Sequence, residues 1–267
     1  MVKVGITLPS FVDDAAAVFA IARAADETGI DGAFVFEHLF RTASDGSRRC
    51  ALDCWATLGS LAVETSGIRL GPFAARATLR PAAVLAHSCA TLQRIVGDRV
   101  LAIIGAGDAQ SRAENEEFGV GFADIEERLA ATRSAVELVL ESGIETWVAG
   151  RHEYLLDLAA RTDGWNSWGS NLATFAARAE RVVRANPKAM VSWSGIVVVD
   201  ATDASAESKA KRLGTTSSRL VGSPRTISEK LRPFIDAGAQ WLILAPADSS
   251  NVANVSWLAE VKERLAS

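Results

Sequence analysis

The sequence contains only three cysteines, Cys50, Cys54 and Cys89, in 267 residues. An odd and sparse set does not provide the disulfide framework of a small secreted protein, and a chain of this length does not need one. Cys50 and Cys54 lie four positions apart with no second pair of ligands, which does not fit a structural zinc site. We therefore expect reduced thiols and a cytoplasmic protein.

The chain also lacks any apolar run that approaches the ~20 residues of a membrane span. Its first residues, MVKVGITLP, are typical of a strand and lack the charged segment and apolar core of a signal peptide. The formal net charge of −4 comes without a clustered basic stripe, which argues against nucleic acid as the main partner. We expect a small-molecule substrate and neither a membrane nor a nucleic acid as partner.

Several catalytic signatures are missing as well. The sequence has no G-x-S-x-G nucleophile elbow, no His-x-His pair, and no lysine at the end of a predicted strand. These absences argue against a nucleophile-elbow hydrolase, a metal-dependent barrel hydrolase and a Schiff-base enzyme. We predict no metal at the functional site.

What the sequence does contain is an alternation of short apolar strands and amphipathic helices, the pattern of α/β proteins. Eight such units follow one another, which is the number that closes a barrel, and the chain length is typical of that fold. An open dinucleotide-binding sheet is less favoured, because no G-x-G-x-x-G motif opens the chain. We predict a single-domain (β/α)8 TIM barrel over residues 1–267. Its strands are expected at residues 2–8, 32–36, 68–74, 100–104, 146–149, from 163, 190–199 and 241–245.

Two segments do not follow the alternation. Residues 41–50, RTASDGSRRC, are polar and are expected to form a surface loop. Residues 200–222 are polar and rich in serine, and we expect an irregular excursion there that becomes ordered with ligand.

The segment from Gly97 to Gly119 has the clearest functional pattern. Residues 100–104 are apolar on both faces, as in a parallel strand covered on both sides. Gly105 and Gly107 then allow a sharp turn, and Asp108 places a carboxylate at the end of the barrel where such folds carry their chemistry. A plain strand-to-helix turn is the alternative interpretation.

Other polar residues gather at the same end of the predicted barrel. Glu37 and His38 end the second strand. Residues 150–152 follow the fifth strand, and His152 beside Arg151 there is expected to bind an anion. A histidine in this place can move protons near neutral pH, with Asp108 across the mouth as its acid–base partner. The alternative for His38 is a buried imidazole bonded to Glu37 or to backbone.

Taken in order, several short motifs resemble the luciferase-like flavin- or deazaflavin-dependent oxidoreductases, a family of (β/α)8 barrels. The resemblance covers nearly the whole chain and implies an enzyme with a flavin or deazaflavin cofactor. The motifs are FVFEHLF at 34–40, LGPFAA at 70–75 with Arg80-Pro81, GDRVL at 97–101, GAG at 105–107, FG at 118–119, WVAG at 147–150, DGW at 163–165, VGSP at 221–224, AG at 237–238 and LIL at 242–244.

The resemblance also implies roles for individual residues. Strand three carries a bulge that backs the central cofactor ring, the loop after strand four opens the site, and the loop after strand five lies near the cofactor phosphate. The implied catalytic residues are His38, Asp108 and Glu37, and the implied cofactor-binding residues are Ala74, Ala75, Gly105, Ala106, Gly107, Gly150, Arg151 and His152.

The residue after Gly107 is our guide to the cofactor. Members of the family that use flavin mononucleotide (FMN) commonly have tryptophan there, and members that use the deazaflavin F420 often have an acidic residue, as Asp108 is. We predict an F420-dependent oxidoreductase that transfers a hydride between the deazaflavin and a small organic substrate. The alternatives are an FMN-dependent monooxygenase working with a separate reductase, and a non-catalytic flavin-binding barrel.

Two further expectations follow from the family. A single Gly150 followed by Arg151 stands where the family usually has Gly-Gly or Ser-Gly, so the arginine charge replaces backbone N–H donors. A homodimer is expected, formed through the helices near the second and third units.

Overall fold

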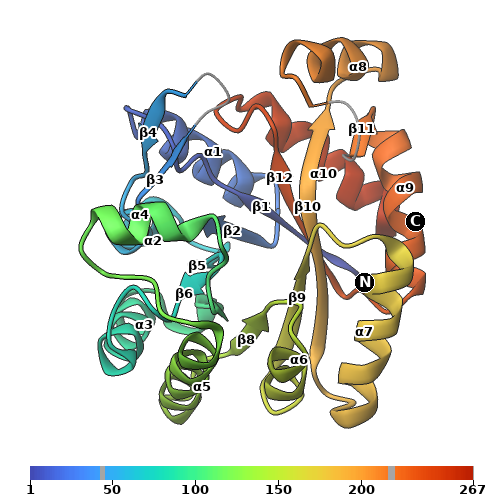
Figure 1. Ribbon diagram of the computed structural model, residues 1–267. Coiled ribbons are helices and arrows are strands. Elements are labelled where there is room, and N and C mark those ends of the chain that lie inside the picture. The colour runs from blue at the N-terminus through green and yellow to red at the C-terminus, as the bar shows by residue number, and fades with distance from the viewer. Residues whose placement is uncertain (43–45, 216–219, 267) are drawn as a thin grey trace.

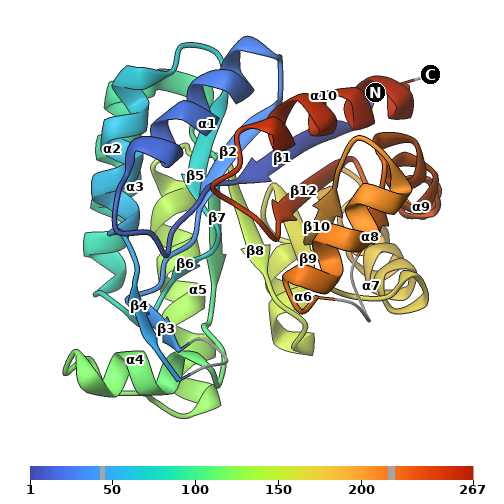
Figure 2. The ribbon, with the colours of Figure 1, turned by 90° about the horizontal axis from the view of Figure 1, so that it is seen from above.

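The computed structural model describes residues 1–42, 46–215 and 220–266. Their main sheet is parallel and curls into a nearly closed barrel with helices around it (Figures 1 and 2). The strand order is β5-β2-β1-β12-β10-β9-β8-β7-β6, with β11 beside β10, which confirms the predicted TIM barrel. The strands are β1 (Lys3–Thr7), β2 (Gly32–Val35), β5 (Arg69–Pro72), β6 (Ala75–Arg76), β7 (Ala102–Gly105), β8 (Thr146–Ala149), β9 (Gly164–Trp168), β10 (Met190–Val199), β11 (Leu220–Gly222) and β12 (Trp241–Pro246).

The barrel closes at the third predicted strand: β5 lies within the predicted range 68–74, and the short strand β6 directly follows it. β5 pairs with β2, β6 pairs with β7, and a parallel bridge joins Leu70 to Val100. The peptide bond between Phe73 and Ala74, where the two pieces meet, is cis. A Cβ atom at Gly71 would lie 1.9 Å from the carbonyl oxygen of Leu101, so only glycine permits this close approach.

Aromatic rings fill the inside of the barrel. Phe34, Trp147 and Trp241 are fully buried in one cluster. Glycines on neighbouring strands make room for them: a Cβ atom at Gly5 would lie 2.7 Å from the ring of Phe34, and one at Gly164 would lie 2.8 Å from the ring of Trp147. The interior is therefore a packed core, and a ligand can bind only at an end of the barrel.

Helices with side-chain caps surround the sheet. Asp53, Asp124 and Asn171 each accept a hydrogen bond from a backbone N–H in the first turn of the helix that follows. The helices are α1 (Ala16–Glu27), α2 (Cys54–Glu64), α3 (Ala82–Val96), α4 (Ser111–Glu117), α5 (Ile125–Glu141), α6 (Glu153–Ala159), α7 (Leu172–Ala185), α8 (Asp203–Arg212), α9 (Pro224–Asp236) and α10 (Ala253–Ala266).

The expected surface loop at 41–50 is in part a hairpin. Strands β3 (Phe40–Thr42) and β4 (Arg48–Cys50) pair antiparallel, while residues 43–45 lie outside the described residues. Both strands are short and mostly exposed, so no buried alternation marks them in the sequence. The hairpin lies beside α4, as both views of the ribbon show (Figures 1 and 2).

The prediction of an irregular excursion at 200–222 is wrong for most of the segment that the structure describes. Residues 203–212 form α8, which starts with a capping box between Thr202 and Ser205, and β11 extends the sheet; residues 216–219 lie outside the described residues. The segment has little apolar periodicity because α8 buries mainly Ala206, Ala210 and one lysine.

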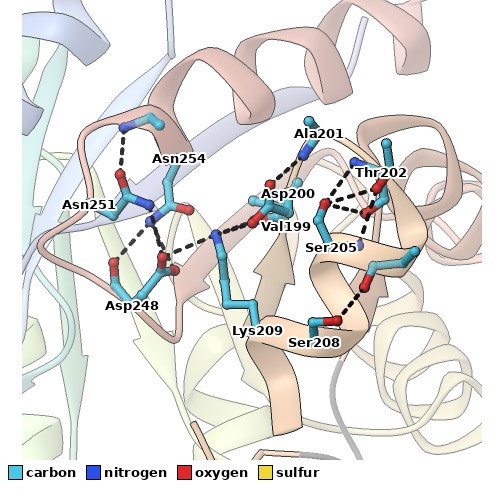
Figure 3. Close-up of polar contacts among 12 residues, drawn as sticks. Val199, Asp200, Ala201, Thr202, Ser205, Ser208, Lys209, Asp248, Asn251 and Asn254 are labelled. Atoms are coloured by element: carbon cyan, nitrogen blue, oxygen red, sulfur yellow. Dashed lines mark hydrogen bonds and ion pairs between the residues drawn. The ribbon is translucent and has the colours of Figure 1, made fainter. Parts of the chain in front are cut away.

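That lysine, Lys209, holds α8 above the carboxyl ends of β10 and β12 (Figure 3). Its Nζ atom donates to the carbonyl oxygen of Val199 at 2.8 Å and lies 3.1 Å from a carboxylate oxygen of both Asp200 and Asp248. The side chain is only 4% exposed, so a buried charge, rather than an apolar face, fixes this helix. No helix in the described ranges is long and apolar enough to cross a membrane.

Candidate functional site

An aromatic wall stands at the carboxyl end of the barrel. The ring of Phe36 lies 5.9 Å from that of Phe73 and 5.7 Å from that of Trp168, and the rings of Phe73 and Trp168 are 5.8 Å apart. Trp168, at the end of β9, is 40% exposed, so this wall is open to a ligand. Flat aromatic surfaces favour a ligand with a ring.

Beside the wall, small residues form a floor. A Cβ atom at Gly105 would lie 3.3 Å from the carbonyl oxygen of Ala149 and 3.5 Å from Cβ of Ala74, so these three residues meet at one point. Ala74 packs with the rings inside the barrel, whereas Ala75 and Ala106 are buried in the outer core. Of the small residues predicted to bind the cofactor, Ala74 and Gly105 therefore form the floor, together with Ala149.

His38 lies near the aromatic wall, with its ring 6.4 Å from that of Phe36, and is held by a residue that the sequence analysis did not identify. Its Nδ1 atom is 2.7 Å from Oε1 of Glu114, on α4. The other carboxylate oxygen of Glu114 accepts the backbone N–H of Leu39 at 2.6 Å and that of Phe40 at 3.3 Å. The His38 side chain is 31% exposed while that of Glu114 is 3% exposed, so the carboxylate anchors the ring from beneath.

Arg76 supports the same carboxylate from β6. Its guanidinium donates to Glu114 at 2.9 Å and to Asn115 at 3.0 Å. Burial raises the pKa of Glu114, but the hydrogen bonds from His38 and Leu39 and the charges of His38 and Arg76 outweigh it and hold that pKa below its usual value. Glu114 is therefore a carboxylate at neutral pH, and His38 donates to it through Nδ1.

Glu37, a predicted catalytic residue, is buried, and both of its carboxylate oxygens accept hydrogen bonds. One oxygen accepts from Trp55 Nε1 and from Arg80, each at 2.7 Å, and the other accepts the backbone N–H of Arg76 at 2.6 Å. Burial raises the pKa of Glu37, against the charge of Arg80 and these hydrogen bonds. These hydrogen bonds tie Glu37 to β6, Trp55 and Arg80, and its catalytic role stays a prediction.

Asp108 does not contact His38 in the described part of the chain. Its Oδ1 atom accepts the backbone N–H groups of Gln110 at 2.9 Å and Ser111 at 3.2 Å. It therefore holds the turn that leads into α4, the helix that carries Glu114. Gly107, just before it, has a φ of +68°, the conformation in which glycine is favoured.

The loop after β8 contains the three remaining predicted residues. The carbonyl oxygen of Gly150 accepts a hydrogen bond from Trp165 Nε1 at 3.0 Å, and Nδ1 of His152 accepts the N–H of Tyr154 at 3.2 Å, which caps α6. Arg151 and His152 are exposed. The loop directly follows Ala149 of the floor, and the His152 side chain serves as the cap of α6.

Glu114 and Arg76 contact the candidate site, and the sequence analysis assigned neither of them to it. The signals were present: Arg76 follows the third predicted strand by two positions, and Glu114 belongs to the acidic segment between Gly107 and Gly119. Nothing in either segment alone indicates that they meet at His38. No group of three His, Cys, Asp or Glu side chains able to hold a metal occurs in the residues that the structure describes.

Comparison with known proteins identifies the family. The family model described as luciferase-like monooxygenase matches residues 2–142. The chain belongs to this family. A curated relative, the F420-dependent glucose-6-phosphate dehydrogenase of Kineococcus radiotolerans, is 34% identical over 133 residues. The match spans 49% of this chain and 37% of that enzyme, so the chain matches only about a third of the relative's length.

Solved structures support the fold of this luciferase-like chain over its whole length. An F420-dependent secondary alcohol dehydrogenase in complex with an F420–acetone adduct aligns with a TM-score of 0.82, at 15% identity over 99% of both chains. The oxygenating constituent of 3,6-diketocamphane monooxygenase from Pseudomonas putida, in complex with FMN, aligns with a TM-score of 0.73, at 18% identity over 99% of this chain and 98% of that one. Both barrels therefore share the fold described above.

Proposed function

We propose that this luciferase-like barrel is an F420-dependent oxidoreductase that transfers a hydride between the deazaflavin and a small organic substrate. The observation that carries the proposal is the pairing of His38 with Glu114 at the end of the barrel that also has the aromatic wall and the floor of small residues. An F420-dependent relative and Asp108 after Gly107 favour this cofactor.

The residues at the mouth fit a flat tricyclic ring. Ala74, Gly105 and Ala149 leave the floor without long side chains, while Phe36 and Trp168 provide aromatic surface beside it. A side chain larger than the present one at any floor position would occupy the space of the ring. These residues would hold the ring system of F420, which when bound supplies a carbon that gives or accepts a hydride.

His38 would handle the proton that accompanies the hydride. Because Glu114 is a carboxylate, it fixes the proton on Nδ1 and leaves Nε2 as the ring nitrogen that gives or takes a proton at the exposed side. Arg76 keeps Glu114 charged, and Asp108 sets the start of α4 so that Glu114 reaches His38. Arg151 and His152 would lie toward the cofactor phosphate, where exposed Arg151 offers charge.

An FMN-dependent monooxygenase is the second candidate. The observation that favours it is the likeness in fold to a monooxygenase component in complex with FMN. The same floor and wall suit the ring of FMN, so the choice between the two cofactors depends on the residues around the ring edge, of which Asp108 is one.

The proposal is tested by measuring F420 affinity, by fluorescence quenching, in wild type, Gly105→Ala and Gly59→Ala. The first substitution adds a methyl group to the floor, and we expect F420 to bind at least about fivefold more weakly, since overpacking costs about 1–3 kcal/mol. The second adds a methyl group on α2 with no atom within 4 Å and should leave the affinity unchanged. Equal F420 affinity in all three proteins would place the ring elsewhere.

The homodimer also stays a proposal. Val63 on α2 and Val84 and Ile95 on α3 are 79%, 48% and 54% exposed, which gives this pair of helices apolar surface for a second copy. Light scattering on wild type and on Val63→Glu tests it: a dimer that becomes a monomer is expected, and a monomeric wild type would contradict it.

A further inference from the structure

The ring of His38, the group proposed to handle the proton, contacts two aromatic rings. The centre of the Phe11 ring, in the segment after β1, is 5.8 Å from that of His38, and the centre of the Phe36 ring, after β2, is 6.4 Å away. All three side chains belong to half-buried residues, so each keeps some surface for a ligand. A substrate whose oxygen meets Nε2 of His38 therefore has aromatic carbon next to that oxygen.

The apolar surface continues from Phe36 onto β9 and β10. Trp168 meets the Phe36 ring edge-on at 5.7 Å and is 40% exposed. In the parallel pair of these strands Trp168 lies opposite Ser194, and Ile196, two positions further along β10, shares that face. Ile196 is half-buried. This side of the mouth thus offers carbon surface to a ligand.

The polar side chains on the same face of β9 and β10 bond to one another. Nδ2 of Asn166 donates to Oγ of Ser192 at 2.9 Å, and Oγ of Ser194 donates to Oδ1 of Asn166 at 3.1 Å. All three residues are at most 1% exposed. A hydroxyl group of a substrate placed against this face would lose water without gaining these partners, which costs free energy.

The charges at the ends of β10 and β12 are paired in the same way. Lys209 lies 3.1 Å from a carboxylate oxygen of both Asp200 and Asp248 and is only 4% exposed (Figure 3). Its positive charge is neutralised inside the protein. A phosphate or carboxylate group of a substrate therefore gains little from this lysine.

We propose that the substrate is a neutral alcohol or the corresponding carbonyl compound with an apolar ring or chain, and that Phe11, Phe36 and Trp168 contact this apolar part. The proposal rests on the proposed function, because it names the substrate of that hydride transfer. When the alcohol is oxidised, its C–H bond breaks and the hydrogen leaves as a hydride to the ring carbon of oxidised F420. The hydroxyl proton goes to Nε2 of His38, and the carbonyl compound remains.

Two probes of equal ring size test the substrate class. Ligand-observed NMR titrations of the full chain measure the dissociation constants of cyclohexanol, which is neutral, and of cyclohexanecarboxylate, which is an anion. We expect saturable binding of cyclohexanol, at least about fivefold tighter than that of the carboxylate, because the anion must lose more hydration at an apolar surface.

Substitutions at Trp168 test the place of binding. Trp168→Ala should weaken cyclohexanol binding at least about fivefold, since an aromatic contact is lost, and Trp168→Phe, which keeps a ring, should bind within about twofold of wild type. Val183→Ala is the matched control, because Val183 is 39% exposed in the last turn of α7, and it should bind cyclohexanol like wild type.

The same titrations are repeated with saturating F420. Tighter binding of the carboxylate, equal cyclohexanol affinity in Trp168→Ala and wild type, or cyclohexanol binding in neither state would overturn the proposal. If F420 binds and cyclohexanol does not, the cofactor stands and the substrate class is wrong. If cyclohexanol binding depends on Trp168 but F420 does not bind, the apolar site stands and the proposed cofactor is wrong.

Discussion

The substitution Glu114→Gln probes the site most informatively, because it removes a charge without changing the size of the side chain. Glu114 is 3% exposed and receives hydrogen bonds from His38, Arg76 and the backbone of Leu39. The amide keeps one acceptor oxygen but leaves the buried Arg76 guanidinium without its countercharge. Breaking a buried ion pair from one side costs about 3–5 kcal/mol.

We therefore expect Glu114→Gln to lower the free energy of unfolding by about 3 kcal/mol at pH 7.5, measured by urea denaturation. Glu116→Gln is the control, since Glu116 forms only an exposed pair with Arg112 at 3.4 Å on the same helix, and such pairs contribute about 0–1 kcal/mol. Equal destabilisation by the two substitutions at pH 7.5 would refute the assignment of Glu114 as a buried anchor.

The pH dependence of this difference has a defined sign. The pKa of Glu114 is lowered in the folded protein, so its charge stabilises the fold fully above the unfolded pKa, near 4.5, and this stabilisation is lost as the pH falls through the folded value. The gap between wild type and Glu114→Gln should therefore shrink as the pH is lowered below about 4.5. A gap that stays constant down to that range would show that the charge is not responsible.

Two further predictions concern residues outside the site. Burial raises the pKa of the Cys54 thiol well above its usual range and that of Cys89 to about 12, whereas Cys50 is exposed. A thiol reagent should therefore label one cysteine in the native protein and three after denaturation. Lys209→Met should lower the free energy of unfolding by about 3 kcal/mol and make α8 sensitive to protease. The additional substitution Asp248→Asn should restore part of this stability. Protease resistance equal to wild type would contradict the role of Lys209.

The sequence was sufficient for the barrel because its signals are local. Strand β8 and the valine-rich end of β10 are short apolar runs, and the caps Asp53, Asp124 and Asn171 directly precede their helices. The hairpin β3–β4 and helix α8 were missed for the same reason: their stability comes from contacts with distant residues, as Lys209 shows, and not from an apolar period of their own.

The site was only partly predictable. His38 and Gly105 could be proposed because strand ends of a barrel share one mouth, but the partner of His38 is 76 positions away, on a short polar helix. Glu37 was assigned to catalysis because it precedes His38, and its three hydrogen bonds to Trp55, Arg80 and Arg76 became visible only in the folded chain. A side chain's neighbour in sequence is thus a poor guide to its partner in space.

The central claim, F420 as the cofactor, is tested most directly by titrating the purified wild-type protein with oxidised F420 and, separately, with FMN, and comparing the two dissociation constants. The account predicts saturable F420 binding that is tighter than FMN binding. Tighter binding of FMN would contradict the assignment from Asp108 and favour the monooxygenase, and binding of neither would contradict a flavin-type cofactor at this mouth.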